Sequence, residues 1–162
     1  MFVAWGIFAT LSFWSARNRS NPALGKRWFK LHVIAASATV LFTTAGAILI
    51  SFYFEWHFFP LDHPHHWLGF FIMLALAGQV ILGIVIHWLW DPSRRGESEP
   101  WYDILHWYLG RSAYVASFFE MYLGISMLTQ DAPNTPTFIM ALFLLFTALV
   151  ASVFLLGQVL AA

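Results

Sequence analysis

The chain has no cysteine among its 162 residues. This absence excludes disulfides, zinc sites built from thiolates, iron–sulfur clusters and the covalent attachment of c-type haem. Charged residues are also scarce, because Asp, Glu, Lys and Arg together make up 10% of the chain and the formal net charge is zero. A chain without excess positive charge is not attracted to phosphate backbones, so we expect no nucleic-acid partner. No basic segment precedes the first apolar run, so we expect no cleaved signal peptide.

Apolar residues are abundant instead. They form 60% of the chain, against about 45–50% in soluble domains, and they gather in long runs. A membrane-spanning helix needs about 20 apolar residues, and runs of this length exclude barrel strands. The sequence therefore predicts one all-α domain over 1–162, a polytopic membrane helix bundle in the lipid membrane, with a four-helix core and a fifth transmembrane helix. The expected helices cover about 2–17, 28–52, 65–90, 101–128 and 136–160.

The basic residues predict an orientation. All eight Lys and Arg residues fall in two connections and at one further position. The connections at 53–64 and 129–136 contain neither residue type. Because positively charged loops stay on the cytoplasmic side, we expect the N-terminus outside and the C-terminus on the cytoplasmic side.

Two of the apolar runs share one pattern of His, Gly, a polar residue and Gly. Each matched pair of positions is 41 apart: His65 and His106, Gly69 and Gly110, Gln79 and Glu120, Gly83 and Gly124. His106 and Glu120 are 14 positions apart, which is about 21 Å along an α-helix. Since the two runs cross the membrane in opposite directions, Glu120 should lie at the depth of His65, and Gln79 at the depth of His106.

Two histidines begin apolar runs on the same, inner side of the membrane. His32 and His106 should therefore lie at similar depth, where they can supply both axial nitrogens to a haem iron. Gly110, one turn after His106, would leave room for the porphyrin. The alternative is that such histidines only anchor helices at the interface. We interpret His57, His63 and His87 as interfacial or loop residues, with His87 within reach of a haem propionate.

Several motifs, taken in chain order, resemble the cytochrome b561 family, in the form linked to DOMON domains. The resemblance covers about 1–128 and includes Trp28-Phe29-x-Leu31-His32, His65-x-x-Leu68-Gly69, Gln79-x-x-x-Gly83 and His106-x-x-Leu109-Gly110-Arg111. It implies two b-type haems, one near each membrane face, with ligands pairing helix one with three and helix two with four.

Carried onto this chain, the resemblance implies His32 and His106 as the inner pair and His65 as one ligand of the outer haem. His66 is the alternative to His65, although it would break the 41-residue spacing. Arg111 is a candidate partner for a propionate or an anionic donor. The resemblance also places Gly69, Gln79 and Gly110 at the haem sites.

Two features depart from the family pattern. The family's first-helix histidine lies four residues before the position of Met1, so one haem site is complete in the sequence and the second lacks a ligand. Either the chain is a fragment or the outer site is ligated differently, five-coordinate or empty. Glu120 stands where relatives commonly have Asn. It could couple protonation to reduction, or act as a neutral hydrogen-bonding group near Tyr122, and we favour the second interpretation.

The resemblance implies transmembrane electron transfer from a cytoplasmic donor such as ascorbate to an outer acceptor. Ferric chelates, the ascorbyl radical or a redox domain are the candidate acceptors, which would make the chain a transmembrane reductase. The alternative hypothesis is an accessory subunit, with or without haem, of a larger membrane redox complex. Donor and acceptor would be small molecules or proteins, and a homodimer or a larger complex is compatible with the sequence.

Overall fold

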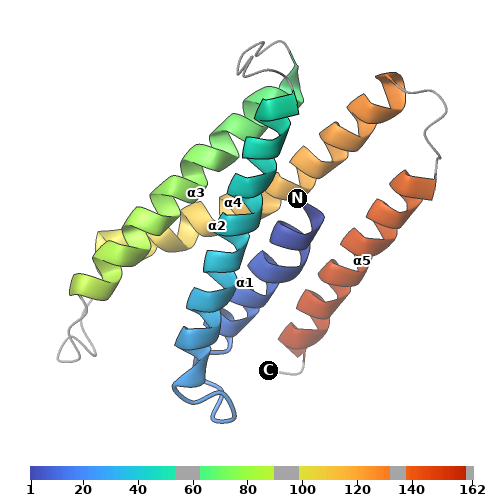
Figure 1. The fold of residues 1–162 in the computed structure, drawn as a ribbon. Helices are drawn as coiled ribbons and strands as arrows, with labels where there is room; N and C mark the ends of the chain where they lie inside the picture. The colour runs from blue at the N-terminus through green and yellow to red at the C-terminus, as the bar shows by residue number, and fades with distance from the viewer. Residues whose placement is uncertain (54–62, 90–98, 132–137, 160–162) are drawn as a thin grey trace. The chain divides into compact units, whose positions relative to one another are not determined.

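A computed structural model describes residues 1–53, 63–89, 99–131 and 138–159, and every regular element in these ranges is a helix (Figure 1). The prediction of an all-α fold is therefore confirmed. The elements are η1 (Phe2–Ala9), α1 (Thr10–Arg17), α2 (Arg27–Tyr53), α3 (Pro64–Leu89), α4 (Trp101–Asp131) and α5 (Phe138–Val159). The bounds lie within three residues of the ranges expected from the sequence. η1 is π-helical and continues directly into α1, so that together they form the first helix.

The turn between α1 and α2 follows from local hydrogen bonding. The Asn18 side-chain amide donates to the carbonyl of Trp14 at 2.8 Å and satisfies a carbonyl in the last turn of α1. The carboxamide oxygen of Asn21 then accepts from the N–H of Ala23 at 2.9 Å. Gly25 has a φ of 50°, a left-handed conformation that glycine adopts without steric cost. The chain can therefore reverse within a few residues before α2 begins.

His63 has a structural role at the start of α3. Its Nδ1 accepts a hydrogen bond from the backbone N–H of His65 at 3.2 Å, as an N-cap side chain does. Pro64 occupies the first helical position, where a missing N–H is tolerated. These contacts fix where α3 begins and account for His63 without ligation, in agreement with its interpretation as a loop residue.

Two of the described helices, α2 and α3, are long and apolar enough to cross a membrane, and the described part of α5 adds a shorter apolar stretch, Phe138–Ser152. We expected five spans. α4 has sufficient length, but it carries Asp103, Arg111, Glu120 and Asp131, which lower its average hydropathy. The first helix is short, as expected from the sequence.

The chain divides into two compact units, whose described parts are considered separately below. The first unit lies within Met1–Pro60 and Met121–Ala162 and contains η1, α1, α2, α5 and the end of α4. The second unit lies within Leu61–Glu120 and contains α3 and most of α4.

Small and hydroxyl-bearing residues form the contacts between the first helix and α2. Ser15 is completely buried, and Thr39 is 3% exposed. The Thr39 hydroxyl lies 3.0 Å from the carbonyl oxygen of Ala35 and 3.3 Å from that of Ala4 in η1. Small residues allow helix backbones to approach closely in lipid, where hydroxyl groups also bond between helices. The contact between η1 and α2 is therefore of the kind used inside membranes.

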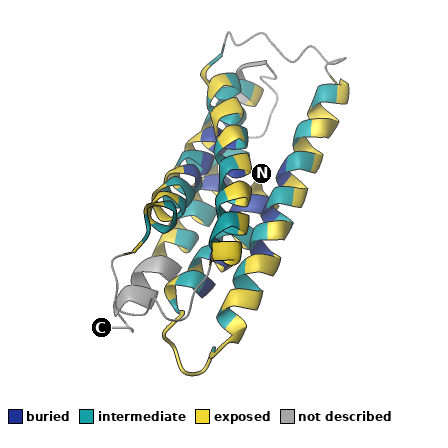
Figure 2. Cartoon of the chain, turned by 90° about the vertical axis from the view of Figure 1, so that its left-hand side faces the viewer, coloured by how far each residue is buried: buried dark blue, intermediate teal, exposed yellow. Residues whose placement is uncertain are grey.

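Large apolar side chains show the opposite pattern. Leu41 and Leu49 of α2 are 66% and 70% exposed, and Leu145 of α5 is 68% exposed. Figure 2 shows exposed residues on many turns of the described helices. Exposed apolar surface of this extent is unfavourable in water, whereas lipid chains cover it without cost. The exposure pattern supports the membrane assignment.

Gly6 permits a close contact between η1 and α5. The Phe146 ring occupies the position that a Cβ on Gly6 would take, and Phe2 packs edge-on against the same ring at 5.9 Å. We expect Gly6→Ala to displace the ring and lower the thermal unfolding midpoint in detergent, at a cost of about 1–3 kcal/mol for overpacking.

Gly46 supplies the matched control, because no atom of the described residues outside the backbone of its own helix lies within 4 Å of its added Cβ. Gly46→Ala should leave the midpoint unchanged or raise it slightly, since alanine is the better helix former. Equal midpoints for the two variants would contradict the packing role of Gly6.

Candidate functional site

In the second unit, α3 and α4 run antiparallel and approach each other at glycines. A Cβ on Gly78 would lie 3.2 Å from a methyl of Leu109, and one on Gly83 would lie 3.8 Å from Cε1 of His106. Both glycines therefore leave room for a side chain of α4 beside α3. Polar side chains of the two helices also meet between them.

Two polar contacts between the helices involve the repeated pattern, and each of them links a residue of one copy to a residue of the other. The Nδ1 of His65 lies 2.9 Å from Oε1 of Glu120. The side-chain amide of Gln79 donates to the backbone carbonyl of His106 at 2.8 Å. Each polar residue thus reaches the histidine of the other copy. The prediction that Glu120 lies level with His65, and Gln79 level with His106, is confirmed.

The glycines of the two copies also occupy equivalent places. A Cβ on Gly69 would lie 2.7 Å from Oε1 of Glu120, and one on Gly110 would lie 3.1 Å from Oε1 of Gln79. Each glycine therefore makes room for the polar side chain of the facing helix. We expected Gly110 to make room for a porphyrin; the structure gives it and Gly69 this packing role, and a role toward haem stays a prediction.

Glu120 is the most deeply placed charged group of this helix pair. Its residue is 3% exposed. Oε1 contacts His65 on α3, and the hydrogen bond expected near Tyr122 stays a prediction. Oε2 is also buried and has no hydrogen-bond partner among the described residues. A buried carboxyl group next to a histidine is costly in lipid, and such groups mark functional sites by default.

His32 lies in the first unit and is held by α1. Its Nδ1 is 2.9 Å from the Ser12 hydroxyl and 3.1 Å from the Ser12 backbone carbonyl. Ser12 is itself 7% exposed. Sequence reasoning missed Ser12, although a serine within an apolar run was a signal that could have identified it, because polar groups inside membrane helices usually have a partner.

The surroundings of His32 fit axial ligation of a haem, and the Nδ1 of His65 also lies beside an oxygen atom, that of Glu120. A carbonyl oxygen only accepts hydrogen bonds, so the contact of His32 with the Ser12 carbonyl places the proton on Nδ1 of that ring. Nε2 is then the nitrogen with the lone pair that can bind iron. Metal-binding histidines commonly donate their other N–H to a carbonyl or a carboxylate in this way. The donor set is therefore suitable for haem, and ligation itself stays a prediction.

The structure also bears on the remaining candidates. His65 contacts the buried carboxyl group of Glu120 on α4, and the choice of His65 over His66 as a ligand stays a prediction. The His106 backbone is fixed by Gln79, whereas His32 belongs to the other unit, so the pairing of His32 with His106 stays a prediction. His87 lies in the last turn of α3. His57 lies outside the described residues.

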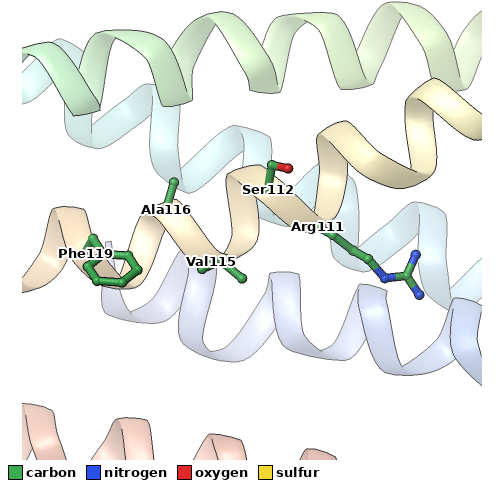
Figure 3. A pocket seen from close by; sticks show the side chains of 5 residues that line it. All are labelled: Arg111, Ser112, Val115, Ala116 and Phe119. Carbon is green, nitrogen blue, oxygen red and sulfur yellow. The ribbon is translucent and has the colours of Figure 1, made fainter.

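Arg111 lies at one end of a shallow hollow on α4. The hollow is lined by Arg111, Ser112, Val115, Ala116 and Phe119, which form one stripe along the helix (Figure 3). The guanidinium carbon lies 3.3 Å from the centre of the Trp107 ring, a cation–π contact that holds the side chain. A fixed guanidinium beside an apolar stripe is suited to an anionic group with an apolar body, and its ligand stays a prediction.

Histidines within long apolar helices are typical of one class of protein, the helical membrane cytochromes. The eukaryotic cytochrome b561 family matches the chain over residues 3–130. The chain belongs to this family of integral membrane, haem b-binding helical bundles, as its motifs suggested.

A curated relative is ferric-chelate reductase 1 of Bos taurus, which is 27% identical over 149 residues. The match covers 83% of this chain and 22% of the relative, so the chain spans about a fifth of that protein. No solved structure matches the chain.

Proposed function

We propose that the chain carries electrons across a membrane through haem b. The observation that carries the proposal is the placement of His32 and His65, each with its Nδ1 beside an oxygen atom, in a chain that belongs to a b-type cytochrome family. A bound haem would supply reversible one-electron chemistry. The chain itself supplies ligands, their orientation and an apolar surrounding that excludes water.

His32 and His106 are the proposed axial ligands of one haem, and His65 is a proposed ligand of a second. The family pattern supports both assignments. The carbonyl of Ser12 keeps the His32 ring in one tautomer, and Gln79 holds the backbone at His106. Ligands whose rings are fixed before binding need little reorganisation when iron changes its charge, which favours electron transfer over ligand exchange.

The direction of transfer follows from charge. The basic residues at 17–30 and 94–95 and the lack of Lys and Arg at 53–64 and 129–136 support a cytoplasmic donor side and an outer acceptor side. An anionic donor of the ascorbate type suits the basic side. The relative named ferric-chelate reductase 1 supports a ferric chelate as acceptor, with the ascorbyl radical or a redox domain as other candidates.

A pyridine haemochrome assay on the purified full chain tests the proposal. We expect haem b, with a stoichiometry of one or two per chain that reports whether the second site is ligated. A chain purified under conditions that supply haem, yet containing none, would contradict the proposal. That result would favour the accessory-subunit hypothesis.

A further inference from the structure

Two of the candidate ligands are held by chemically different acceptors. The His32 ring donates to the oxygens of Ser12, a backbone carbonyl at 3.1 Å beside a hydroxyl at 2.9 Å. The Nδ1 of the His65 ring lies 2.9 Å from Oε1 of the Glu120 carboxyl group. The first acceptor set is neutral and the second can carry a full negative charge. The two rings therefore differ in how much electron density their Nε2 atoms can offer to a metal.

We propose that Glu120 is a positioning residue for the haem ligated by His65 and lowers the reduction potential of that haem. This inference rests on the proposed function. A negatively charged carboxylate this close to Nδ1 stabilises positive charge on the imidazole and makes it a more basic ligand. A more basic ligand stabilises ferric iron relative to ferrous iron, and hydrogen bonding around axial ligands is one of the means by which proteins set haem potentials.

The packing around Glu120 strengthens this effect. Its side chain is 4% exposed, whereas that of His65 is 30% exposed. Water is therefore largely excluded from the carboxyl group, and electrostatic interactions are stronger where the effective dielectric constant is low. Oε2 is buried and has no hydrogen-bond partner among the described residues.

Gly69 makes the contact possible. A Cβ at this position would lie 2.7 Å from Oε1 of Glu120, so any larger residue would push the carboxyl group off the ring. The other contact between the two copies differs. Gln79 lies beside Gly110 and donates to the backbone of His106. The equivalent positions 79 and 120 therefore differ in role. The Gln79 amide binds a backbone carbonyl, whereas the Glu120 carboxyl group contacts a histidine ring.

The test is a redox titration of the purified, haem-loaded full chain, followed by its visible spectrum, for wild type and Glu120→Gln. Glutamine keeps the shape of the side chain and removes its charge. We expect the midpoint of one haem to rise, so that its ratio of reduced to oxidised form at a fixed potential increases about tenfold, or about 59 mV for one electron. The other midpoint should not move.

Two further variants separate the explanations. Gly46→Ala adds a methyl group where no described atom outside the backbone of its own helix lies within 4 Å, so it should shift neither midpoint. Gly69→Ala keeps the charge of Glu120 but displaces its carboxyl group, so it should raise the same midpoint as Glu120→Gln. This variant also provides the test if Glu120→Gln fails to fold.

The outcomes are distinct. Haem in the wild type with midpoints that neither Glu120→Gln nor Gly69→Ala moves would overturn the role of Glu120 and leave the proposed function intact. A loss of thermal stability without a change in potential would show a structural role only, and would overturn the inference in the same way. Absence of haem from the wild type would overturn both proposals.

Discussion

His106→Ala is expected to remove one haem b per chain, and His32→Ala should remove the same haem. The reason is that a low-spin haem with two axial histidines loses affinity and changes its spectrum when either ligand is removed. The double variant should lose no more haem than each single variant, because both ligands serve one iron. Haemochrome quantification and the reduced-minus-oxidised spectrum measure both effects.

His87→Ala is the matched control, since His87 lies in the last turn of α3 and we do not assign it as an axial ligand. It should keep the full haem content. Haem content that falls additively in the double variant, or that does not fall in either single variant, would contradict the assignment of His32 and His106 to one site.

His65→Ala is expected to have two effects, whereas His66→Ala should have neither. His65→Ala should remove the haem that the His106→Ala variant retains. It should also lower the thermal unfolding midpoint of the haem-free chain. The second effect follows because Glu120 would keep a buried carboxyl group without its observed partner, which costs about 1–3 kcal/mol. Haemochrome assays and thermal unfolding in detergent measure the two effects separately.

His66→Ala is a closely matched control for His65→Ala. His66 follows His65 directly, so both variants change the same turn of α3 and the same total number of histidines. If His66→Ala loses haem and His65→Ala does not, the 41-residue pattern has been assigned to the wrong histidine. The role given to Glu120 would then fail as well.

The sequence predicted the depth of the polar groups in the membrane because helix geometry alone determines this depth. The rise per residue is nearly constant in an α-helix, so a 14-residue separation on each of two antiparallel helices brings Glu120 to His65 and Gln79 to His106. The structure confirms both pairs. No knowledge of side-chain packing was needed for this step.

The side chains that pack against the glycines could not be predicted in the same way. Which group fills the space beside Gly69 or Gly110 depends on the facing helix and on the rotamers of its side chains, and these are tertiary properties. The partner of His32 was missed for the same reason, since Ser12 is distant in sequence and meets it only once α1 packs on α2. α4 also continues to Asp131, three residues past its expected end, because no helix-breaking residue occurs before Pro133.

The central claim is that electrons cross the membrane through this chain, and reconstitution into sealed vesicles tests it most directly. Vesicles of neutral phospholipid would hold ascorbate inside, with a ferric chelate and a ferrous-iron indicator outside. We predict that ferrous iron appears outside with haem-loaded chain and not with the His32→Ala/His106→Ala double variant. A haem-loaded wild-type chain that transfers electrons no faster than protein-free vesicles would contradict the claim.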